Sequence, residues 1–144
     1  MERCVIHLFG ASGSGTSTLG RFIADRMDCF FMDTDDYYWQ PTDPKYTTSR
    51  PIPERLELMQ RDIAAHKRVV ISGSLVDWGD GLIPLFTLAI RVETPTAVRI
   101  ARLRARERAR FGSRLDPDGD MYAQHEKFIR WAADYDEGDI HMRS

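Results

Sequence analysis

Lysine is scarce in this sequence: three lysines, Lys45, Lys67 and Lys127, stand beside seventeen arginines. Two cysteines, Cys4 and Cys29, are too few for a disulfide framework. The formal net charge of -2 does not favour a general nucleic-acid binder. We find no secretory leader and no apolar run of membrane-spanning length. These absences predict a cytoplasmic protein with no nucleic-acid or membrane partner, in which any functional positive charge comes from arginine.

A glycine-rich segment at 10–17 lies between an apolar run and the start of a helical pattern. The Walker A pattern asks for Gly, four free positions, Gly, Lys and then Ser or Thr. Gly10, Gly15 and Ser17 meet this pattern, while Thr16 takes the place of the lysine. Glycines permit backbone conformations in which successive N–H groups surround a phosphate. The residues predicted to bind the phosphates of ATP, or of another nucleoside triphosphate, are Gly10, Ala11, Ser12, Gly13, Ser14, Gly15, Thr16, Ser17 and Thr18.

The Ser17 hydroxyl is predicted to ligate the Mg²⁺ that accompanies the nucleotide. Because Thr16 removes the mobile charge of the usual lysine, an arginine from another part of the chain has to replace it. The alternative is that the segment is only a Gly/Ser turn, which the surrounding strand and helix patterns disfavour.

Strand and helix patterns alternate along the chain, which predicts a single α/β domain. Apolar runs predict strands at 4–9, 29–32, 69–72 and 88–92. Helical spacing predicts a first helix through Leu19, Phe22, Ile23 and Met27, and further helices over 54–66, over 96–110 and over 119–135. In the helix over 96–110, we expect Leu103 and either Val98 or Ala101 to face inward.

The chain resembles the P-loop kinases related to adenylate kinase and uridine kinase. The resemblance covers nearly all of the chain and depends on the loop at 10–18, the acidic and aromatic segment 33–39, and Val92-Glu93-Thr94-Pro95 followed by arginines. It implies a three-layer P-loop NTPase fold, with a parallel sheet in the order 2-3-1-4 and helices on both faces. It also implies an acceptor-binding segment at about 33–55 and a short arginine-rich lid at about 106–118.

The acidic segment follows the second predicted strand, at the sheet edge where open α/β folds bind ligands. Asp33 or Asp35 is predicted to serve the metal or to orient and deprotonate an acceptor hydroxyl. A structural alternative is that one of these aspartates only caps a turn or a helix. Where related kinases end the third strand in Asp-Gly, this chain has Ser72, so either Asp33 or Asp77 replaces that carboxylate. The residues predicted to bind the acceptor are Asp36, Tyr37, Trp39, Arg50 and Gly73.

Two arginines in this segment, Arg50 and Arg55, could bind a phosphate or carboxylate of the acceptor. We expect Arg55 to be a solvated arginine on a helix surface, which makes Arg50 the better candidate. A phosphate-bearing acceptor would indicate a monophosphate kinase, whereas the segment around Tyr37 favours an acceptor hydroxyl. The sequence leaves these alternatives open.

Seven arginines fall between Arg99 and Arg114. Most are expected on solvated helix faces, but phosphoryl transfer needs positive charge around the transferred group. Arg106, Arg110 and Arg114 are predicted to supply it from the lid. Nucleic-acid binding is the alternative interpretation of this basic run, which the acidic balance elsewhere disfavours.

Taken together, these patterns predict a kinase that transfers the γ-phosphate of Mg-ATP to a nucleoside, nucleoside monophosphate or similar small metabolite, as a monomer or a homodimer. A non-catalytic or weakly hydrolytic nucleotide-binding protein is the alternative, favoured by Thr16 and Ser72. Related kinases usually end in one more strand, and segment 139–144 has no apolar run to form it. We therefore expect that strand to be missing, to come from a partner subunit, or to follow beyond the sequence.

Overall fold

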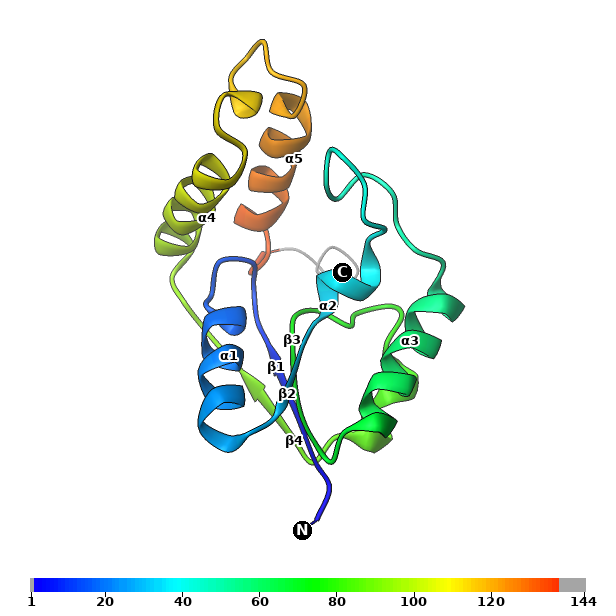
Figure 1. Ribbon diagram of the computed structural model, residues 1–144. Coiled ribbons are helices and arrows are strands. Elements are labelled where there is room, and N and C mark those ends of the chain that lie inside the picture. Colours follow the sequence, from blue (N-terminus) through cyan, green and yellow to red (C-terminus); the bar gives the residue numbers. More distant parts are fainter. Residues whose placement is uncertain (1, 138–144) are drawn as a thin grey trace. The chain divides into compact units, whose positions relative to one another are not determined.

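Strands and helices alternate along the chain in a computed structural model, which describes residues 2–137 (Figure 1). The strands are β1 (Cys4–Phe9), β2 (Phe30–Asp33), β3 (Arg68–Ser72) and β4 (Leu88–Arg91). The helices are α1 (Thr16–Met27), α2 (Thr34–Tyr38), α3 (Ile52–Ala65), α4 (Thr96–Phe111) and α5 (Tyr122–Ala133). Short 3₁₀ helices cover Asp80–Leu85 and Gly112–Leu115.

The four strands form one parallel sheet in the order β2-β3-β1-β4, which confirms the predicted order. In register, Ile6 of β1 pairs with Val70 of β3 and with Leu88 of β4, and Asp33 of β2 pairs with Ser72 of β3. The last residues of β2 and β3 therefore lie side by side at the carboxyl edge of the sheet, where α/β folds place their ligands.

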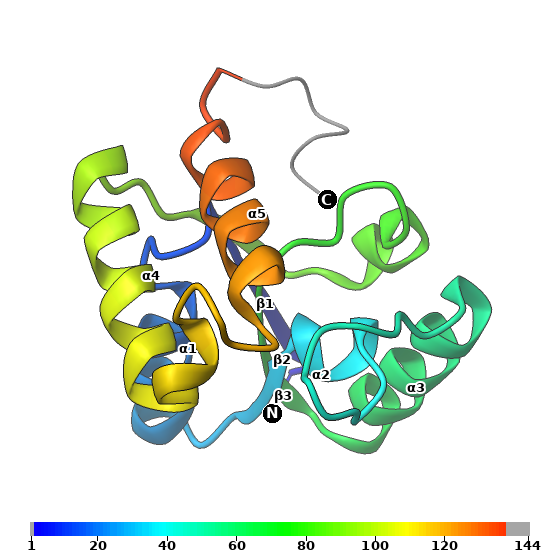
Figure 2. The same ribbon diagram turned by 90° about the horizontal axis from the view of Figure 1, so that it is seen from above.

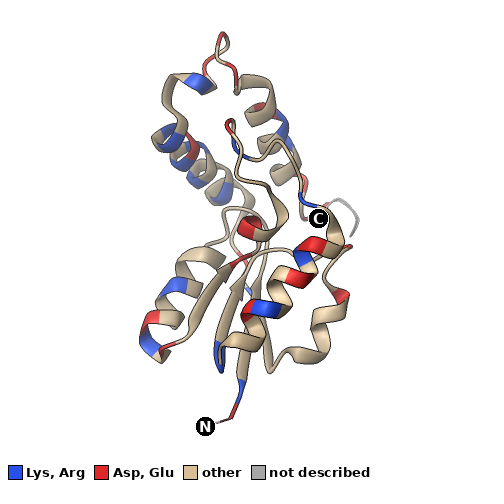
Figure 3. Cartoon of the chain, turned by 45° about the vertical axis from the view of Figure 1, so that its right-hand side comes forward, with Lys and Arg blue, Asp and Glu red and all other residues tan. Residues whose placement is uncertain are grey.

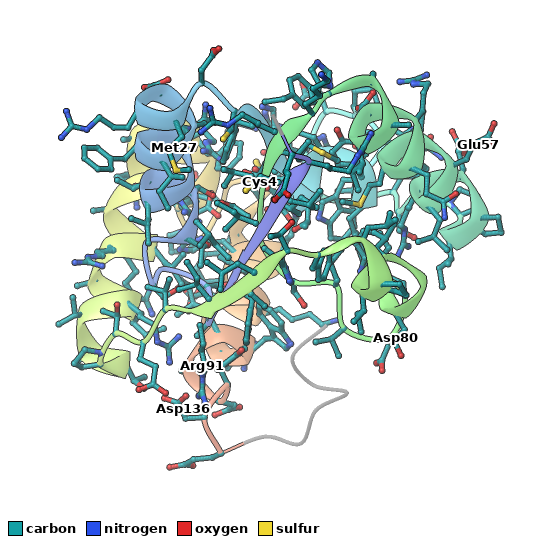
Figure 4. The ribbon with its side chains drawn as sticks, turned by 90° about the horizontal axis from the view of Figure 1, so that it is seen from below. Cys4, Met27, Glu57, Asp80, Arg91 and Asp136 are labelled. Atoms are coloured by element: carbon teal, nitrogen blue, oxygen red, sulfur yellow. The ribbon has the colours of Figure 1, made fainter. Side chains whose placement is uncertain are left out.

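Alternate residues of the sheet face two different helices, which gives the predicted three layers. Val5, Val69 and Ile71 pack in one cluster with Met59 and Ile63 of α3. On the other face, Ile6, Leu8 and Val70 pack with Leu19 and Ile23 of α1. Figure 2 shows α1 and α3 on opposite sides of β1, and Figure 4 shows the same arrangement with Met27 on α1 and Glu57 on α3.

Contacts divide the described residues into two compact units. The first unit contains 2–10 and 16–92, which include the sheet and α1 to α3. The second unit contains 11–15 and 93–137, which include α4 and α5. The middle of the glycine-rich loop thus belongs to the second unit, while its two ends belong to the first.

In the second unit, α4 buries Arg99, Leu103 and Glu107, spaced four residues apart. Leu103 packs with Ile129 and Ala132 of α5. The prediction for Leu103 is confirmed, but the prediction that Val98 or Ala101 faces inward is wrong, because Val98 is 41% exposed and Ala101 is exposed as well. Arg99 takes the inward position because its guanidinium donates hydrogen bonds to backbone carbonyl oxygens.

The ends of the helices differ slightly from the predicted ones. α3 begins at Ile52, two residues before the predicted start, because Pro53 lies in the first turn, where the missing N–H does no harm. α5 is shorter than predicted at both ends. The expected lack of a final strand concerns 139–144, which lie outside the described residues. Of the helices within 2–137, none has the length and apolar character that crossing a membrane requires.

Candidate active site

The glycine-rich loop follows β1 and leads into α1, which begins at Thr16. Gly13 and Gly15 have φ angles of +82° and +98°, a region that side chains with a Cβ rarely adopt. A Cβ on Gly13 would also lie only 2.7 Å from the carbonyl oxygen of Arg99. Among the described residues, no group accepts a hydrogen bond from the N–H of Gly13 or Gly15. Two donors in the loop are therefore left for an anion.

Arg99 anchors the middle of this loop within the second unit. Its side chain is fully buried, and Nη1 donates to the carbonyl oxygens of Ser12 (3.2 Å) and Ala132 (3.0 Å). Nε donates to the carbonyl oxygen of Thr94 at 3.2 Å, and the Thr94 hydroxyl donates to the carbonyl oxygen of Ser14 at 2.9 Å. Sequence reasoning missed Arg99 because it treated the arginine run as solvated, although the spacing of Arg99, Leu103 and Glu107 marks one helix face.

Ser14, at the centre of the loop, carries an unsatisfied hydroxyl. The residue is 4% exposed, and its Oγ has no hydrogen-bond partner among the described residues. An unpaired buried hydroxyl costs about 1–3 kcal/mol. The loop thus retains polar groups that the protein itself does not satisfy.

Ser17 and Asp33 lie together in the first unit, as the sequence predicted for the two proposed metal ligands. The Ser17 hydroxyl, in the first turn of α1, donates to Oδ2 of Asp33 at 3.3 Å. The other carboxylate oxygen, Oδ1, accepts the backbone N–H of Asp35 at 3.0 Å and caps α2. The capping alternative is therefore correct for one oxygen of Asp33, while the second oxygen faces the loop serine.

Ser72, which stands where related kinases have an aspartate, has a structural contact. Its hydroxyl is fully buried and donates to the carbonyl oxygen of Thr16 at 2.9 Å, which fixes the start of α1 against β3. Asp77, the other candidate to replace the carboxylate, is exposed on a turn with a φ of +70°. Of the two candidates, Asp33 is the acid that touches Ser17.

Gly73 follows Ser72 with a φ of +120°, and a Cβ there would overlap the side chain of buried Thr34. Its N–H donates to the carbonyl oxygen of Leu8 at 3.0 Å, and its carbonyl oxygen lies 2.8 Å from Nε2 of His7. Burial lowers the pKa of His7, although the Gly73 carbonyl partly offsets this effect. The glycine is thus required by the close approach of α2 to the end of β3.

The acidic residues of α2 carry part of the predicted acceptor site. Asp35 and Asp36 both lie in the first turn of this helix, directly after Asp33. Partial desolvation, and then the negative charge of Asp33, raise the pKa of Asp36 above its ordinary value, while Arg21 and Lys45 oppose the shift. Three carboxylates therefore gather at the carboxyl end of β2.

The three aromatic residues that follow are divided between the core and the surface loop. Tyr37 is buried in the α3 side of the core, and its hydroxyl donates to Oδ2 of Asp62 at 2.6 Å. Trp39 lies against Tyr38 and Tyr46, with ring centres 4.7 and 6.1 Å away. Tyr37 therefore has a packing role, and Trp39 remains the more accessible aromatic group.

Arg50 and Arg55 differ in how their charges are compensated. Arg50 donates from Nη1 to Oε1 of Glu54 at 3.0 Å and from Nε to the carbonyl oxygen of Tyr37 at 3.1 Å. The prediction that Arg55 is solvated is wrong, because its side chain is only 6% exposed. Its guanidinium carbon lies 3.9 Å from the ring centre of Tyr38 and 5.4 Å from that of Trp78. Sequence reasoning missed this burial because aromatic stacking leaves no hydropathy pattern.

The energy of these ring contacts is small compared with the cost of burying the charge of Arg55. Cation–π contacts contribute about 0.5–2 kcal/mol, whereas the effective penalty for burying an ion is several kcal/mol. Among the described residues, no carboxylate pairs with this guanidinium. Arg55 therefore lies buried with its charge only partly compensated.

Basic residues, blue in Figure 3, recur along α4. The arginines of this helix and of the predicted lid differ in their contacts. Arg114 forms a two-point pair with Asp120, from Nε to Oδ1 at 2.9 Å and from Nη2 to Oδ2 at 2.7 Å. Arg110 lies beside the ring of Phe111, 5.9 Å from its centre. Within the described part of the chain, neither Arg102 nor Arg106 has a carboxylate partner.

Arg102 is the arginine that lies against the glycine-rich loop. Its Nη1 is 3.4 Å from the carbonyl oxygen of Gly13 and 3.9 Å from the position that a Cβ on Gly15 would take. The sequence predicted that Arg106, Arg110 and Arg114 supply the replacement charge, and this stays a prediction. It did not single out Arg102, which lies one helical turn before Arg106. The spacing of three residues from buried Arg99 would have placed Arg102 near the same face of α4.

Comparisons with known proteins identify both a relative and a fold. The chain is 40% identical over 139 residues to the uncharacterized protein YqaC of Bacillus subtilis strain 168, a match that covers 96% of this chain and 76% of YqaC. No protein-family model matches the sequence.

Among solved structures, a gluconokinase from Sinorhizobium meliloti 1021 matches with a TM-score of 0.53 and 22% identity, over 72% of this chain and 65% of that one. The chain thus spans a little under two thirds of the gluconokinase. A shikimate kinase from Acinetobacter baumannii, in complex with shikimate, matches with a TM-score of 0.53 and 17% identity, over 94% of this chain and 77% of that one. The fold is therefore that of the P-loop kinases.

Proposed function

Since the chain belongs to the family of Bacillus subtilis YqaC and has the fold of the P-loop kinases, we propose that it transfers the γ-phosphate of Mg-ATP to a small metabolite. The observation that carries the proposal is the contact between Ser17, at the end of the glycine-rich loop, and Asp33, at the end of β2. A turn without function would not need a serine and a carboxylate together at the edge of a parallel sheet.

The loop is suited to bind phosphate through its backbone. Two of its N–H groups, those of Gly13 and Gly15, and the hydroxyl of Ser14 lack partners among the described residues. Phosphate oxygens are strong acceptors for such donors at the N-terminus of a helix. The carbonyls of Ser12 and Ser14 are held by Arg99 and Thr94, so the loop keeps its shape without a ligand.

The oxygen atoms of Ser17 and Asp33 suit Mg²⁺, which prefers hard oxygen ligands. When bound, the ion would neutralise charge on the phosphates and help to orient them. Asp35, next in the same helix, is the residue proposed to accept the proton of an acceptor hydroxyl. The acceptor classes proposed from the sequence are a nucleoside, a nucleoside monophosphate or a similar small metabolite, and the small-molecule kinases among the structural neighbours support a small acceptor.

Arg102 is proposed to supply the positive charge that Thr16 does not. It lies beside Gly13 and Gly15, and no described carboxylate neutralises it. Arg106, one turn further along α4, is proposed to add charge at the transferred group, whereas Arg114 is already paired with Asp120. The Arg102→Met variant should lose at least tenfold in kcat/KM. Arg104→Met, on the exposed side of the same helix, should change it by less than twofold.

The alternative, a nucleotide-binding protein without transfer activity, is tested by calorimetric titration with ATP and GTP, each with and without Mg²⁺. We expect Mg²⁺-dependent binding that weakens in Asp33→Asn, where asparagine keeps the helix cap but loses the charge. Asp25→Asn, an exposed change on α1, is the matched control. Absence of nucleotide binding would refute the proposal, and binding without ADP formation across acceptors would favour the alternative. The cytoplasmic location and the monomeric or homodimeric state remain predictions.

A further inference from the structure

Arg55 is a buried arginine for which the described chain provides no acidic partner. We propose that this guanidinium binds an anionic group of the phosphate acceptor, either a carboxylate or a phosphate, so that the acceptor is an anion rather than an uncharged nucleoside. The inference rests on the proposed function, which it deepens by assigning the chemical class of the acceptor.

The backbone around Arg55 brings it to the end of α2. After Trp39 the chain forms a loop that ends beside Trp39 again, where an isolated antiparallel bridge joins Trp39 and Ser49. At its base, the N–H of Arg50 donates to the carbonyl oxygen of Tyr38 at 2.7 Å. α3 then begins, and Arg55 in its first turns places its guanidinium over the ring of Tyr38. The position of Arg55 is thus set by backbone hydrogen bonds and not by a charge partner.

Most of the hydrogen-bonding capacity of this guanidinium is unused. A guanidinium has five N–H donors, and in Arg55 the Nε–H donates to the carbonyl oxygen of Arg50 at 2.6 Å. Within 2–137, neither Nη1 nor Nη2 donates to any group. By contrast, buried Arg99 donates to three carbonyl oxygens. The rings of Tyr38 and Trp78 hold the plane of the Arg55 guanidinium, which leaves an ordered pair of nitrogens for a two-point contact with an anion.

The location favours the acceptor over the nucleotide as the source of that anion. Tyr38, on which Arg55 lies, ends the same short helix whose first turn holds the acids Asp35 and Asp36. From Thr34 to Tyr38 the helix rises about 6 Å, at about 1.5 Å per residue. A small metabolite can span this distance, with its hydroxyl near the acids and its anionic group near Arg55. The glycine-rich loop, in contrast, has its own arginines in Arg99 and Arg102.

The experiment measures anion binding to the full chain saturated with Mg-ADP, so that the loop is already occupied. Inorganic phosphate and acetate are titrated separately, and the melting temperature and tryptophan emission are recorded. At a tenfold excess over its Kd, the bound anion should raise the melting temperature by about 3–5 °C. A saturable change in emission is also expected, because Trp78 lies against Arg55. A response to phosphate alone indicates a phosphorylated acceptor, and a response to acetate indicates a carboxylate.

Matched arginine-to-lysine changes on α3 decide the assignment. Arg55→Lys keeps the charge but loses the planar fork and should weaken anion binding at least tenfold. Arg61→Lys, whose side chain is 69% exposed, should leave it unchanged. If Arg55→Lys does not fold, loss of the emission change in Trp78→Phe, with the shift in melting temperature retained, places the bound anion beside the ring that Arg55 contacts. No saturable response in the wild type, or the same response in Arg55→Lys, would overturn the inference.

Prior titration with Mg-ADP separates the two possible failures. If the nucleotide does not bind, the proposed function fails, and the inference about the acceptor fails with it. If the nucleotide binds but the anion response does not depend on Arg55, only the inference fails. In that case an uncharged acceptor becomes the preferred class.

Discussion

Removing the guanidinium of Arg99 is expected to damage both stability and nucleotide binding. The residue is fully buried, and its N–H groups donate to the carbonyl oxygens of Ser12, Thr94 and Ala132. In Arg99→Met the carbonyl oxygens of Ser12 and Thr94 would lose this donor, and that of Ala132 would keep only backbone N–H donors. Each bond to a charged group contributes about 1.5–3 kcal/mol, but the burial cost of the charge is removed with it. Each buried carbonyl oxygen that is left without a donor costs about 1–3 kcal/mol, so the substitution should cost about 3–5 kcal/mol in total.

For a chain of this length, such a loss should lower the melting temperature by about 10 °C. Because Ser12 lies in the glycine-rich loop, the Kd for Mg-ATP should rise at least tenfold in the same variant. The control is Arg104→Met on the same helix, whose pair with Glu126 is exposed and worth about 0–1 kcal/mol. Thermal unfolding and calorimetry test both effects. Equal melting temperatures and equal Mg-ATP affinities for the two variants would refute the reasoning that Arg99 supports the loop.

Three further results are expected. The pKa of Asp36 is raised in the folded protein, so its ionisation opposes folding as the pH rises above 3.8. The Asp36→Asn variant should therefore have a higher melting temperature than the wild type at pH 7. This gain should disappear below about pH 3.8. The hydrogen bond from Arg114 lowers the pKa of Asp120, so Asp120→Asn should lower the melting temperature at neutral pH. The difference should be small and should shrink at high salt. It should vanish as the pH falls through the lowered pKa of Asp120. Thr16→Lys alone should change turnover little, but it should restore part of the activity that Arg102→Met loses. If turnover stays low in the double variant, a lysine at position 16 cannot replace the charge of Arg102.

The strands and their order follow directly from patterns in the sequence. Runs such as Val69-Val70-Ile71 are apolar without interruption, as strands covered on both faces require, and each predicted strand lies within one residue of the observed one. The closeness of Ser17 and Asp33 was also predictable, because Ser17 follows β1 and Asp33 ends β2 at the carboxyl edge of one parallel sheet. Helix ends were less predictable, since they depend on local capping, as at Asp33, where one carboxylate oxygen starts the five-residue helix α2.

The buried arginines were not predictable from hydropathy, because burial of Arg99 and Arg55 depends on partners that are distant in sequence. Arg99 is satisfied by the carbonyl oxygen of Ser12, 87 residues away, and by that of Ala132. Arg55 is covered by Trp78, which belongs to a loop after β3. A spacing of three or four residues from other buried positions of a helix can indicate that such an arginine faces inward. Only the tertiary fold supplies the atoms that make its burial possible.

These arginines also bear on the proposal that a chain with three lysines binds phosphate through its glycine-rich loop. A lysine in the loop would combine two tasks, since it would hold the loop and contact the phosphates. Under the proposed function the two tasks are separated, because Arg99 holds the loop backbone from inside and Arg102 lies exposed beside Gly13 and Gly15. If the two tasks are separated in this way, substitutions of Arg99 and Arg102 must affect different properties of the protein. Arg99→Met should lower both stability and affinity, whereas Arg102→Met should unfold at the wild-type temperature and lose only affinity and turnover.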